Sequence, residues 1–481
     1  MKKEYKILLG IFILALIIRV AFVFASPVKI WDETVYTNLG YDLSNTPFDY
    51  SVENNGWSDF IPQSDGFYGW PNMGFRAPLL PYLLSLFYLF NLGSLVSFFI
   101  AFVGALSVCL VYLLGKKMFN KKVAIYSAIM FLLIPLHVIY SAKILTGVLF
   151  TFFVLLTFFS FWKGYEEGDK KYKVLFGVFL ALTLLSRYTA LWIIPVFFLY
   201  FLVRDKSLRF LKDKYLWGAV GVFFLTLVPW FIYGLTTYNN LLGAFIHGAK
   251  ASAYWGGVQP WYFFFLNWPV MFSIIGFLFV VGVIYILYKK DFLRREIYLL
   301  LIWFVFFLGM AIYMPHKENR FILAIVPAIV LISGYFIDKI KRHRKLILIG
   351  IVIICFLQLV IHFGYVYKNS YTDTNKCFLE GNEFLKNVER DSIVITDESS
   401  IIYYYSKKET HFYPNPWSLE SLRSMVENHY KGKDVYIFFT DYDMPLNNEK
   451  NIQINYDLNT SFEKSFECYE DEAFSVIYRY G

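Results

Sequence analysis

The sequence predicts a polytopic all-α membrane protein, with about eleven crossings, that carries a small C-terminal α/β domain. Hydrophobic residues make up 57% of the 481 residues and charged residues only 17%, whereas soluble domains carry about 25% charged residues. Apolar runs long enough to cross a bilayer, at about 20 residues each, recur along most of the chain. These observations exclude an intrinsically disordered chain, a secreted disulfide scaffold and a cytosolic Rossmann enzyme.

The distribution of charge divides the chain into two parts. Residues 368–481 contain 12 basic and 20 acidic side chains, whereas residues 1–367 contain 33 basic and 17 acidic side chains. We therefore expect a membrane domain over 1–367, with a first external loop over 26–76, and a soluble extracytoplasmic domain over 368–481. A basic membrane half does not indicate nucleic-acid binding, because basic residues of membrane proteins gather in cytoplasmic loops.

Six basic clusters set the expected topology, and together they hold 25 of the 33 basic residues in the membrane half. They lie at residues 2–6, 116–122, 163–173, 204–214, 289–295 and 339–345. All six are cytoplasmic if the chain crosses the membrane twice between consecutive clusters. The N-terminus is then cytoplasmic and the C-terminal domain extracytoplasmic, in a plasma membrane. The abundance of Lys, Ile, Tyr, Phe and Asn favours a prokaryotic source.

The expected spans follow one another in chain order. The first, Ile7–Phe24, is longer than the usual core of a signal peptide and is therefore expected to stay as a helix. The return span ends near Leu114, and later spans are expected at Val123–Tyr140, Ile144–Trp162, Leu216–Tyr233, Trp261–Tyr288, Ile297–Tyr313, Phe321–Ile337 and Leu346–Tyr365. Only about 30 residues separate Val174 from Val203, too few for two full spans of about 20 residues each. We expect two short helices there, turning near Arg187.

The C-terminal segment has the pattern of a small α/β domain. Strands are expected at Ser392–Thr396, Val435–Thr440 and Phe474–Tyr480, and a helix at Leu419–His429 with Ser418 as its N-cap. Cys377 and Cys468 fall in this domain, on the side of the membrane where a disulfide is chemically permitted.

Eight basic residues lie outside the cytoplasmic clusters: Arg19, Lys29, Arg76, Lys143, Arg187, Lys250, Lys317 and Arg320. On the expected topology they lie at the outer ends of helices or within the membrane, where charge is costly and often functional. As a group they favour phosphate binding, by Arg as a planar fork and by Lys as a point charge. Any single one could instead be a snorkelling or ion-paired structural charge.

The acidic residues favour chemistry at the outer surface. No expected span contains an acid, whereas ion-coupled transporters usually keep carboxylates within their helices. Asp32 and Glu33 follow the first helix closely. Neighbouring residues point in different directions on a helix or a strand, so only one of the two should aim into a given cleft. The alternative is that both belong to a solvated acidic loop.

Several short motifs together resemble the GT-C membrane glycosyltransferases, and the likeness is closest to the protein O-mannosyltransferase and aminoarabinose-transferase branch. These motifs are Arg19 with Trp31–Tyr36, Phe75–Pro81, Pro135–Lys143, Gly177–Tyr188, and Pro315–Phe321 followed by Pro327. The likeness covers roughly Ile7 to Ile337. Each motif is short, and their order and shared external placement make the match specific.

The resemblance implies an inverting transfer of a sugar from a polyprenyl or dolichyl monophosphate to a hydroxyl of a glycan, protein or lipid acceptor. It implies that Asp32 is the general base, with Glu33 or Glu318 as the nearby second carboxylate. The residues implied for the donor phosphate and lipid are Arg76, Lys143, Arg187, Lys250, His316, Lys317, Glu318 and Arg320. For the sugar or acceptor they are Tyr36, Trp255, Trp261 and Tyr262, although the aromatic residues could equally form an interfacial belt.

No cofactor is required by this scheme, because cations can neutralise a monophosphate leaving group. No cluster of His, Cys and carboxylates has zinc-ligand spacing, so a divalent metal is not supported. Residues 143–147 contain no acid where some members of the family carry one, and the C-terminal domain does not resemble the β-rich insert of the O-mannosyltransferases. Two alternatives remain open: a flippase or transporter of lipid-linked sugars, and a non-catalytic membrane scaffold.

Overall fold

The chain forms two compact units in a computed structural model that describes residues 2–29, 31–51, 73–254, 258–414, 416–442, 449–470 and 473–480. The helical unit consists of Met1–Ala25, Gly74–Leu80 and Leu92–Tyr365. The sheet unit consists of Ser26–Met73, Pro81–Asn91 and Val366–Gly481. The sheet unit therefore takes in most of the first loop as well as the C-terminal segment.

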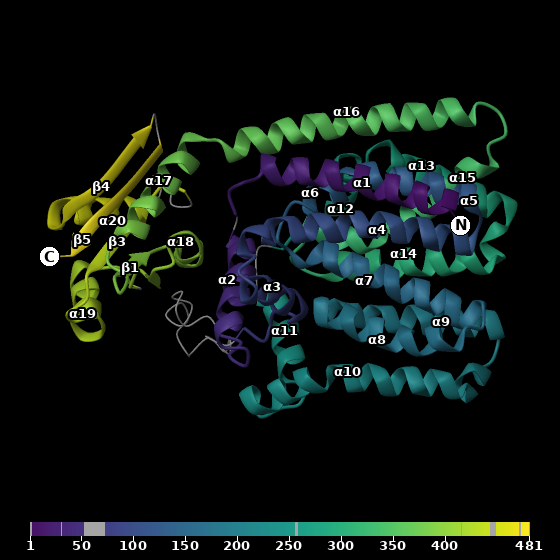
Figure 1. Ribbon diagram of the computed structural model, residues 1–481, viewed down its shortest axis with the longest axis horizontal. Coiled ribbons are helices and arrows are strands. Elements are labelled where there is room, and N and C mark those ends of the chain that lie inside the picture. The colour runs from purple at the N-terminus through teal and green to yellow at the C-terminus, as the bar shows by residue number, and fades with distance from the viewer. Residues whose placement is uncertain are drawn as a thin grey trace. The chain divides into compact units, whose positions relative to one another are not determined.

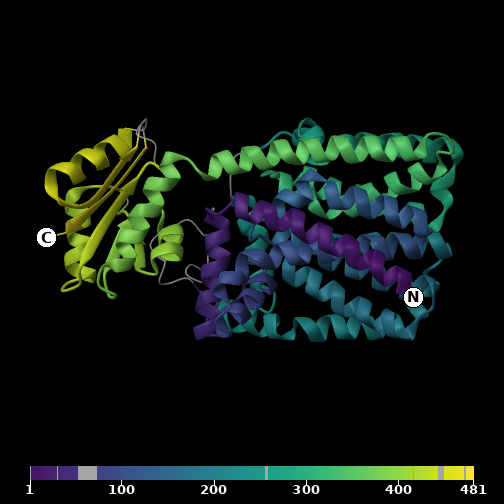
Figure 2. The same cartoon turned by 45° about the horizontal axis from the view of Figure 1, so that its top comes forward.

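The helical unit is a bundle of long apolar helices, whose arrangement can be followed in Figures 1 and 2. Its elements are α1 (Lys2–Ala25), η4 (Gly93–Leu95), α4 (Val96–Met118), α5 (Lys121–Leu133), α6 (Pro135–Tyr140), α7 (Thr146–Phe161), η5 (Trp162–Glu166), α8 (Lys170–Ser186), η6 (Tyr188–Trp192), α9 (Ile193–Asp205), η7 (Leu208–Lys212), α10 (Lys214–Tyr238), α11 (Gly243–Tyr254), α12 (Phe263–Leu266), α13 (Trp268–Lys289), η8 (Asp291–Leu293), α14 (Arg295–Tyr313), η9 (Asn319–Ile325), α15 (Val326–Lys339) and α16 (Arg344–Ser370).

The helices confirm the predicted polytopic fold. Within the described residues, nine helical segments are long and apolar enough to cross a membrane. Two further pieces are shorter, α5 with α6 and α8, and the predicted number of about eleven crossings stays a prediction. The short pair is also where it is expected, because α8 ends at Ser186, Arg187 has extended backbone angles (φ −157°, ψ 128°), and η6 begins at Tyr188.

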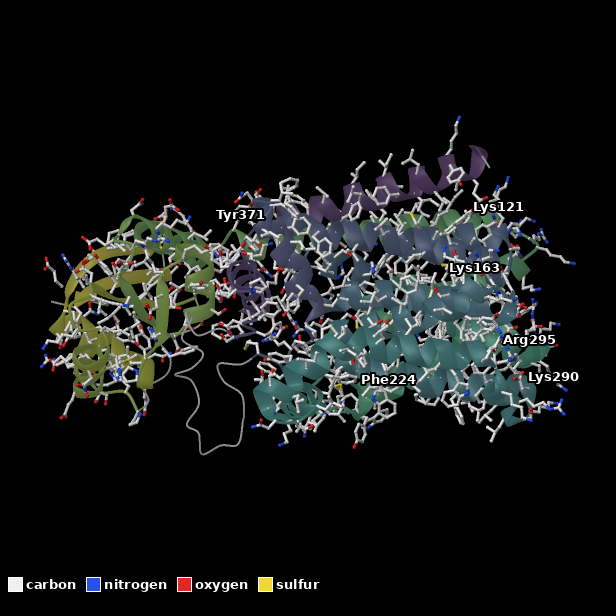
Figure 3. All side chains as sticks on the ribbon, turned by 60° about the horizontal axis from the view of Figure 1, so that its bottom comes forward. Lys121, Lys163, Phe224, Lys290, Arg295 and Tyr371 are labelled. Atoms are coloured by element: carbon white, nitrogen blue, oxygen red, sulfur yellow. A yellow bond between two sulfur atoms is a disulfide. The ribbon has the colours of Figure 1, made fainter. Side chains whose placement is uncertain are left out.

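The basic clusters gather at one end of the bundle. Figure 3 shows Lys121, Lys163, Lys290 and Arg295 together at that end. Acids of the same segments form ion pairs there, and Glu166, whose side chain is 6% exposed, accepts from both Arg204 (2.8 Å) and Arg295 (3.0 Å). The clusters on which the topology was predicted therefore form one common charged rim of the helical unit.

A fully buried polar pair lies among α1, α4 and α6. Arg19 donates from Nη1 to Ala15 O at 3.1 Å, and its Nη2 lies 3.1 Å from His137 Nδ1. Because an arginine can only donate, Nδ1 of His137 is the acceptor and its hydrogen is on Nε2. Both side chains are 0% exposed. Gly104 makes room for the pair, since a Cβ there would lie 3.0 Å from Arg19 Nε and 2.4 Å from Ser141 Oγ.

The sheet unit contains a five-stranded mixed sheet in the order β2-β1-β3-β5-β4, in which β1 is parallel to β2 and β3, and β5 is antiparallel to β3 and β4. Its elements are α2 (Trp31–Asn45), α3 (Leu79–Leu89, from residue 81 onward), α17 (Asp373–Asn387), β1 (Ile393–Thr396), α18 (Ser399–Ser406), β2 (Glu409–Phe412), α19 (Leu419–His429), β3 (Val435–Thr440), α20 (Glu449–Ser461), β4 (Glu463–Glu470) and β5 (Ala473–Tyr480).

The sheet is covered on both faces, which explains its nearly continuous apolar central strands. Ile393 and Ile395 of β1 face α19 and α20, whereas Val394 faces α17 and α18. The three predicted strands and the predicted helix are confirmed, and Ser418 accepts a hydrogen bond from Ser421 N as the N-cap of α19. A disulfide between Cys377 and Cys468 joins α17 to β4.

Candidate functional site

Helix α2 carries the two predicted acids, Asp32 and Glu33, in its first turn. Negative side chains are favoured there, because backbone N–H groups and the helix dipole make the N-terminus positive. The two acids differ in environment: the Glu33 side chain is 1% exposed, whereas Asp32 is half-buried. The structure thus separates by burial two residues that the sequence ranked only through the family resemblance.

One face of α2 is fixed to α18 of the same unit. Asn38 Nδ2 donates to Ser400 O at 2.8 Å, and Thr34 Oγ1 lies 3.3 Å from Ser400 Oγ. Burial, together with the nearby charge of Glu33, raises the pKa of Tyr404 in α18 to about 12. Glu33 is therefore close to α18.

Asp32 points in another direction. Successive residues of a helix are about 100° apart, so Asp32 lies about 160° around α2 from Thr34. It shares a stripe with Tyr36 and Gly40, at spacings of four residues. Gly40 allows α3 to approach, because a Cβ there would lie 2.8 Å from Leu84 Cβ. Asp32 is thus the half-buried acid of the pair, on a different side of α2 from Glu33, and Tyr36 is the buried aromatic residue one turn further along.

The turn between α14 and η9 holds four of the residues predicted to bind phosphate. Glu318 Oε1 accepts a hydrogen bond from Arg320 Nη2 at 2.5 Å and lies 3.1 Å from His316 Nε2. These three side chains therefore form a chain of polar contacts at the surface of one turn. The carboxylate offsets part of the charge of Arg320 and fixes the direction of its guanidinium.

Lys317 in the same turn is engaged with the backbone. Its Nζ donates to Met314 O at 2.6 Å and to Gln259 O at 2.9 Å, and only 5% of the residue is exposed. Gln259 N in turn donates to Pro315 O at 3.0 Å. Lys317 thus ties the segment before α12 to the turn. Its predicted role toward phosphate stays a prediction, and a phosphate would have to compete with these carbonyl oxygens.

Arg187 and Arg320 come together around one aromatic ring. The Arg187 guanidinium lies 5.0 Å from the ring centre of Phe321, and that of Arg320 lies 5.8 Å from the same ring. Both distances allow cation–π attraction. The turn near Arg187 and the motif at residues 315–321, far apart in sequence, are therefore neighbours in the helical unit.

Tyr188 is a positioning residue that the sequence analysis did not single out. Its hydroxyl donates to Gly74 O at 2.7 Å and accepts from Trp230 Nε1 at 2.9 Å. Its ring lies against Gly248 of α11, where a Cβ would be 2.3 Å away. Tyr188 thus fixes the segment that carries Arg76. The only signal in the sequence was its position directly after Arg187 in a recognised motif.

The remaining predicted cations lie in different surroundings. Arg76 is half-buried, with its guanidinium 5.4 Å from the ring centre of Phe75. Lys143 is half-buried in the turn between α6 and α7, and Lys250 is exposed on α11. Their contact with a phosphate stays a prediction.

The predicted aromatic residues lie just before α12. Trp261 and Tyr262 are 66% and 44% exposed, and their ring centres are 5.7 Å apart. Such exposed aromatic pairs suit either a sugar or the membrane interface. Trp255 lies outside the described residues.

Two features bear on other ligands. In the described part of the chain, no group of three or more His, Cys, Asp and Glu side chains is placed to hold a metal ion. The expectation that transfer needs no metal stays a prediction.

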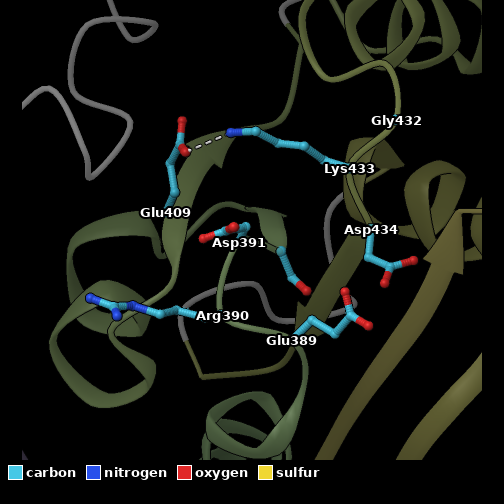
Figure 4. A pocket seen from close by; sticks show the side chains of 8 residues that line it. Glu389, Arg390, Asp391, Glu409, Gly432, Lys433 and Asp434 are labelled. Carbon is cyan, nitrogen blue, oxygen red and sulfur yellow. Dashed lines mark hydrogen bonds and ion pairs between the residues drawn. The ribbon is translucent and has the colours of Figure 1, made fainter.

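The sheet unit also has an open hollow of about 680 Å³ at the amino ends of its parallel strands, shown in Figure 4, where Lys433 pairs with Glu409 at 3.2 Å. In parallel α/β sheets, ligands usually bind at the carboxyl ends of the strands, so this hollow is not the candidate site.

The two units therefore offer two kinds of chemistry. The sheet unit presents a half-buried carboxylate, Asp32, on a helix held along one side, which is what a general base requires. The helical unit presents two guanidinium groups, Arg187 and Arg320, directed by a ring and a carboxylate, which is what stabilisation of a phosphate requires.

Known proteins resemble this chain in sequence and in fold. An uncharacterised protein of Aquifex aeolicus (strain VF5) is 29% identical over 307 residues, which take in 60% of this chain and 59% of that relative. The structure is similar to that of ArnT from Cupriavidus metallidurans bound to undecaprenyl phosphate, with a TM-score of 0.75 at 12% identity, over 98% of this chain and 97% of that one. It is also similar to the archaeal oligosaccharyltransferase AglB from Archaeoglobus fulgidus, in complex with an inhibitory peptide and a dolichol-phosphate, with a TM-score of 0.59 at 15% identity, over 98% of this chain and 74% of that one.

The fold likeness and a family match agree with the resemblance that the sequence motifs predicted. The chain matches the Alg9-like mannosyltransferases over residues 76–404, which is more than half of its length. The match begins at Arg76, includes Arg187 and the turn at residues 315–321, and ends within α18 (Ser399–Ser406). The chain belongs to the Alg9-like mannosyltransferase family.

Proposed function

We propose that the protein is an integral-membrane inverting glycosyltransferase, which moves a hexose or pentose from a polyprenyl or dolichyl monophosphate to an acceptor hydroxyl. The family supports sugar transfer. The structurally similar ArnT binds undecaprenyl phosphate and AglB binds dolichol-phosphate, which supports a lipid-linked donor here. The observation that carries the proposal is the difference between the two acids on α2: Glu33 is 1% exposed, whereas Asp32 is half-buried.

In the proposed reaction, Asp32 takes the proton of the acceptor hydroxyl. The acceptor oxygen attacks the anomeric carbon from the side opposite the phosphate, and the bond between that carbon and the phosphate oxygen breaks. The phosphate leaves on the lipid with the bonding electrons. Arg187 and Arg320 stabilise the charge that gathers on it, and the half-buried Arg76 and Lys143 are the further candidates. Glycan, protein and lipid acceptors all carry the required hydroxyl.

We also propose that the protein lies in a prokaryotic plasma membrane, with its N-terminus in the cytoplasm and its sheet unit outside. The common rim of basic residues supports this orientation, because such residues favour the cytoplasmic side. The relative from Aquifex aeolicus supports a prokaryotic source.

The test is sugar transfer in proteoliposomes supplied with radiolabelled polyprenyl-phosphate sugars and lipid, peptide or glycan acceptors. Asp32→Asn should lower kcat by about 10²–10⁴-fold, the contribution of a general base, while the protein still folds and binds donor. Glu33→Gln, which keeps the shape of a buried side chain, is the matched control and should retain measurable transfer. Full activity of Asp32→Asn would refute the base assignment. Translocation of the lipid-linked sugar without transfer would identify a flippase instead. A protein that shows neither transfer nor translocation would be a non-catalytic membrane scaffold.

A further inference from the structure

The helix that bears Asp32 is fixed by buried polar contacts with α18. Asn38, Thr34 and Ser400 are each 0% exposed. Asn38 Nδ2 donates to Ser400 O at 2.8 Å and lies 3.3 Å from Ser400 Oγ. Polar groups buried in this way must be hydrogen-bonded to specific partners. The contacts therefore select one register and one rotation of α2 against α18.

Contacts at both ends of α2 extend this attachment. The ring of Trp31 lies 6.3 Å from that of Phe412, and Tyr403 donates to Asp42 Oδ1 at 2.9 Å. The attachment therefore runs over about three turns of α2, on the side that bears Thr34 and Asn38.

Rotation of α2 about its axis decides where the Asp32 carboxylate points. A side-chain tip lies about 5–6 Å from the helix axis, so a rotation of about 20° moves it by about 2 Å. A displacement of about 1 Å in a reacting group can lower a rate by about 100-fold. An attachment that fixes this rotation is therefore sufficient to set the reaction rate.

We propose that α18 of the C-terminal segment is a positioning element for the helix that bears the base, and that Asn38 is its central positioning residue. The inference rests on the proposed function and adds a role for the C-terminal segment. Asn38 Oδ1 has no hydrogen-bond partner among the described residues. A leucine of similar volume would remove this unsatisfied atom and fill the same space. The Asn38 amide therefore sets the rotation of α2 against α18 and adds little net stability.

The test is Asn38→Leu in the full-length protein, assayed as in the transfer experiment. We expect kcat per folded molecule to fall about 10–100-fold, with the KM for the polyprenyl-phosphate sugar and the thermal midpoint nearly unchanged. Asn45→Leu is the matched control. It lies on the same helix, is exposed, and among the described residues donates to Tyr41 O of its own helix at 3.3 Å. It should leave kcat unchanged.

Two further measurements separate positioning from general destabilisation. Ser400→Ala removes the hydroxyl but keeps the carbonyl that accepts from Asn38, so its loss of kcat should be smaller than that of Asn38→Leu. Hydrogen exchange should show faster exchange in α2 of Asn38→Leu, with the β1 and β3 amides unchanged. An active wild type with unchanged kcat in Asn38→Leu would overturn this inference alone, as would unchanged exchange in α2. A wild type that transfers no sugar at all would overturn the proposed function with it.

Discussion

Gly177 of α8 lies against the backbone of α10, and an alanine at this position tests how closely the two helices must approach. A Cβ on Gly177 would lie 2.0 Å from Ala219 O and 2.7 Å from Ala219 C. Ordinary van der Waals contact begins at 3.4 Å, so the helices would have to separate locally by about 1.4 Å. Because the opposing atoms belong to the backbone, no change of side-chain rotamer can relieve the overlap.

The expected loss in the free energy of unfolding follows from two opposing effects. Overpacking costs about 1–3 kcal/mol, occasionally more, and replacing glycine by alanine in a helix returns up to about 1 kcal/mol. We therefore expect a net loss of about 1–2 kcal/mol. Arg187 directly follows α8, so a displaced α8 should also move its guanidinium from the Phe321 ring and lower the transfer rate.

The assay is thermal unfolding in detergent, followed by tryptophan fluorescence. Gly221→Ala in α10 is the control, because nothing lies within 4 Å of a Cβ at that position. The control should unfold at the wild-type temperature or slightly above it, and Gly177→Ala clearly below it. Equal midpoints for the two variants would refute the close approach of α8 and α10.

Two further predictions concern buried charge. Burial raises the pKa of Asp42 to about 6, although Tyr403 and Lys407 oppose the shift. The unfolded chain loses this proton near its ordinary value of 3.8, so the free energy of unfolding should fall by about 1–2 kcal/mol, allowing for partial exposure, as the pH rises from about 4 to about 6. In Asp42→Asn the thermal midpoint should depend less on pH between about 4 and about 6 than in the wild type. A midpoint that depends on pH as strongly as in the wild type would contradict the assignment to Asp42. Arg19→Met removes a buried charge and should lower the free energy of unfolding by less than about 1 kcal/mol. His137→Leu leaves that charge without its hydrogen-bond partner and should lower the free energy of unfolding by about 3–5 kcal/mol. A higher thermal midpoint for His137→Leu than for Arg19→Met would contradict this reasoning.

The sequence predicted what depends on local pattern. Apolar run lengths and basic clusters located the spans, including the short pair that turns at Arg187. Continuous apolar runs located β1, β3 and β5, which are buried on both faces, and the preference of serine for helix starts located Ser418. In each case the signal lies within one segment of the chain.

Elements without such a signal were missed. Strand β4 (Glu463–Glu470) is mostly exposed, and three of the four residues of β2 (Glu409–Phe412) are polar, so neither strand forms an apolar run. The attachment of α2 to α18 pairs Asn38 with Ser400 across 362 positions, and Arg19 meets His137 across 118. Contacts of this kind depend on how the folded segments come together, so no window of the sequence contains them.

The eight cations outside the cytoplasmic clusters show why position in the sequence was insufficient to assign their roles. As a group they favoured phosphate binding, and each single residue could also be a structural charge. In the structure Arg19 has its donors on Ala15 O and His137, and Lys317 donates to carbonyl oxygens of a turn. Arg19 is 0% and Lys317 5% exposed, so a structural role explains both residues.

Arg187 and Arg320 are different. They lie on separate elements and converge on one ring, and Arg320 is also held by the carboxylate of Glu318. Two guanidinium groups brought this close repel one another, which disfavours the arrangement unless negative charge offsets it. Glu318 supplies such charge beside Arg320. A phosphate ester would supply more and would be bound most strongly as its charge grows on departure. The convergence of these two residues, rather than the number of cations, is therefore the feature of the helical unit that favours a phosphate leaving group.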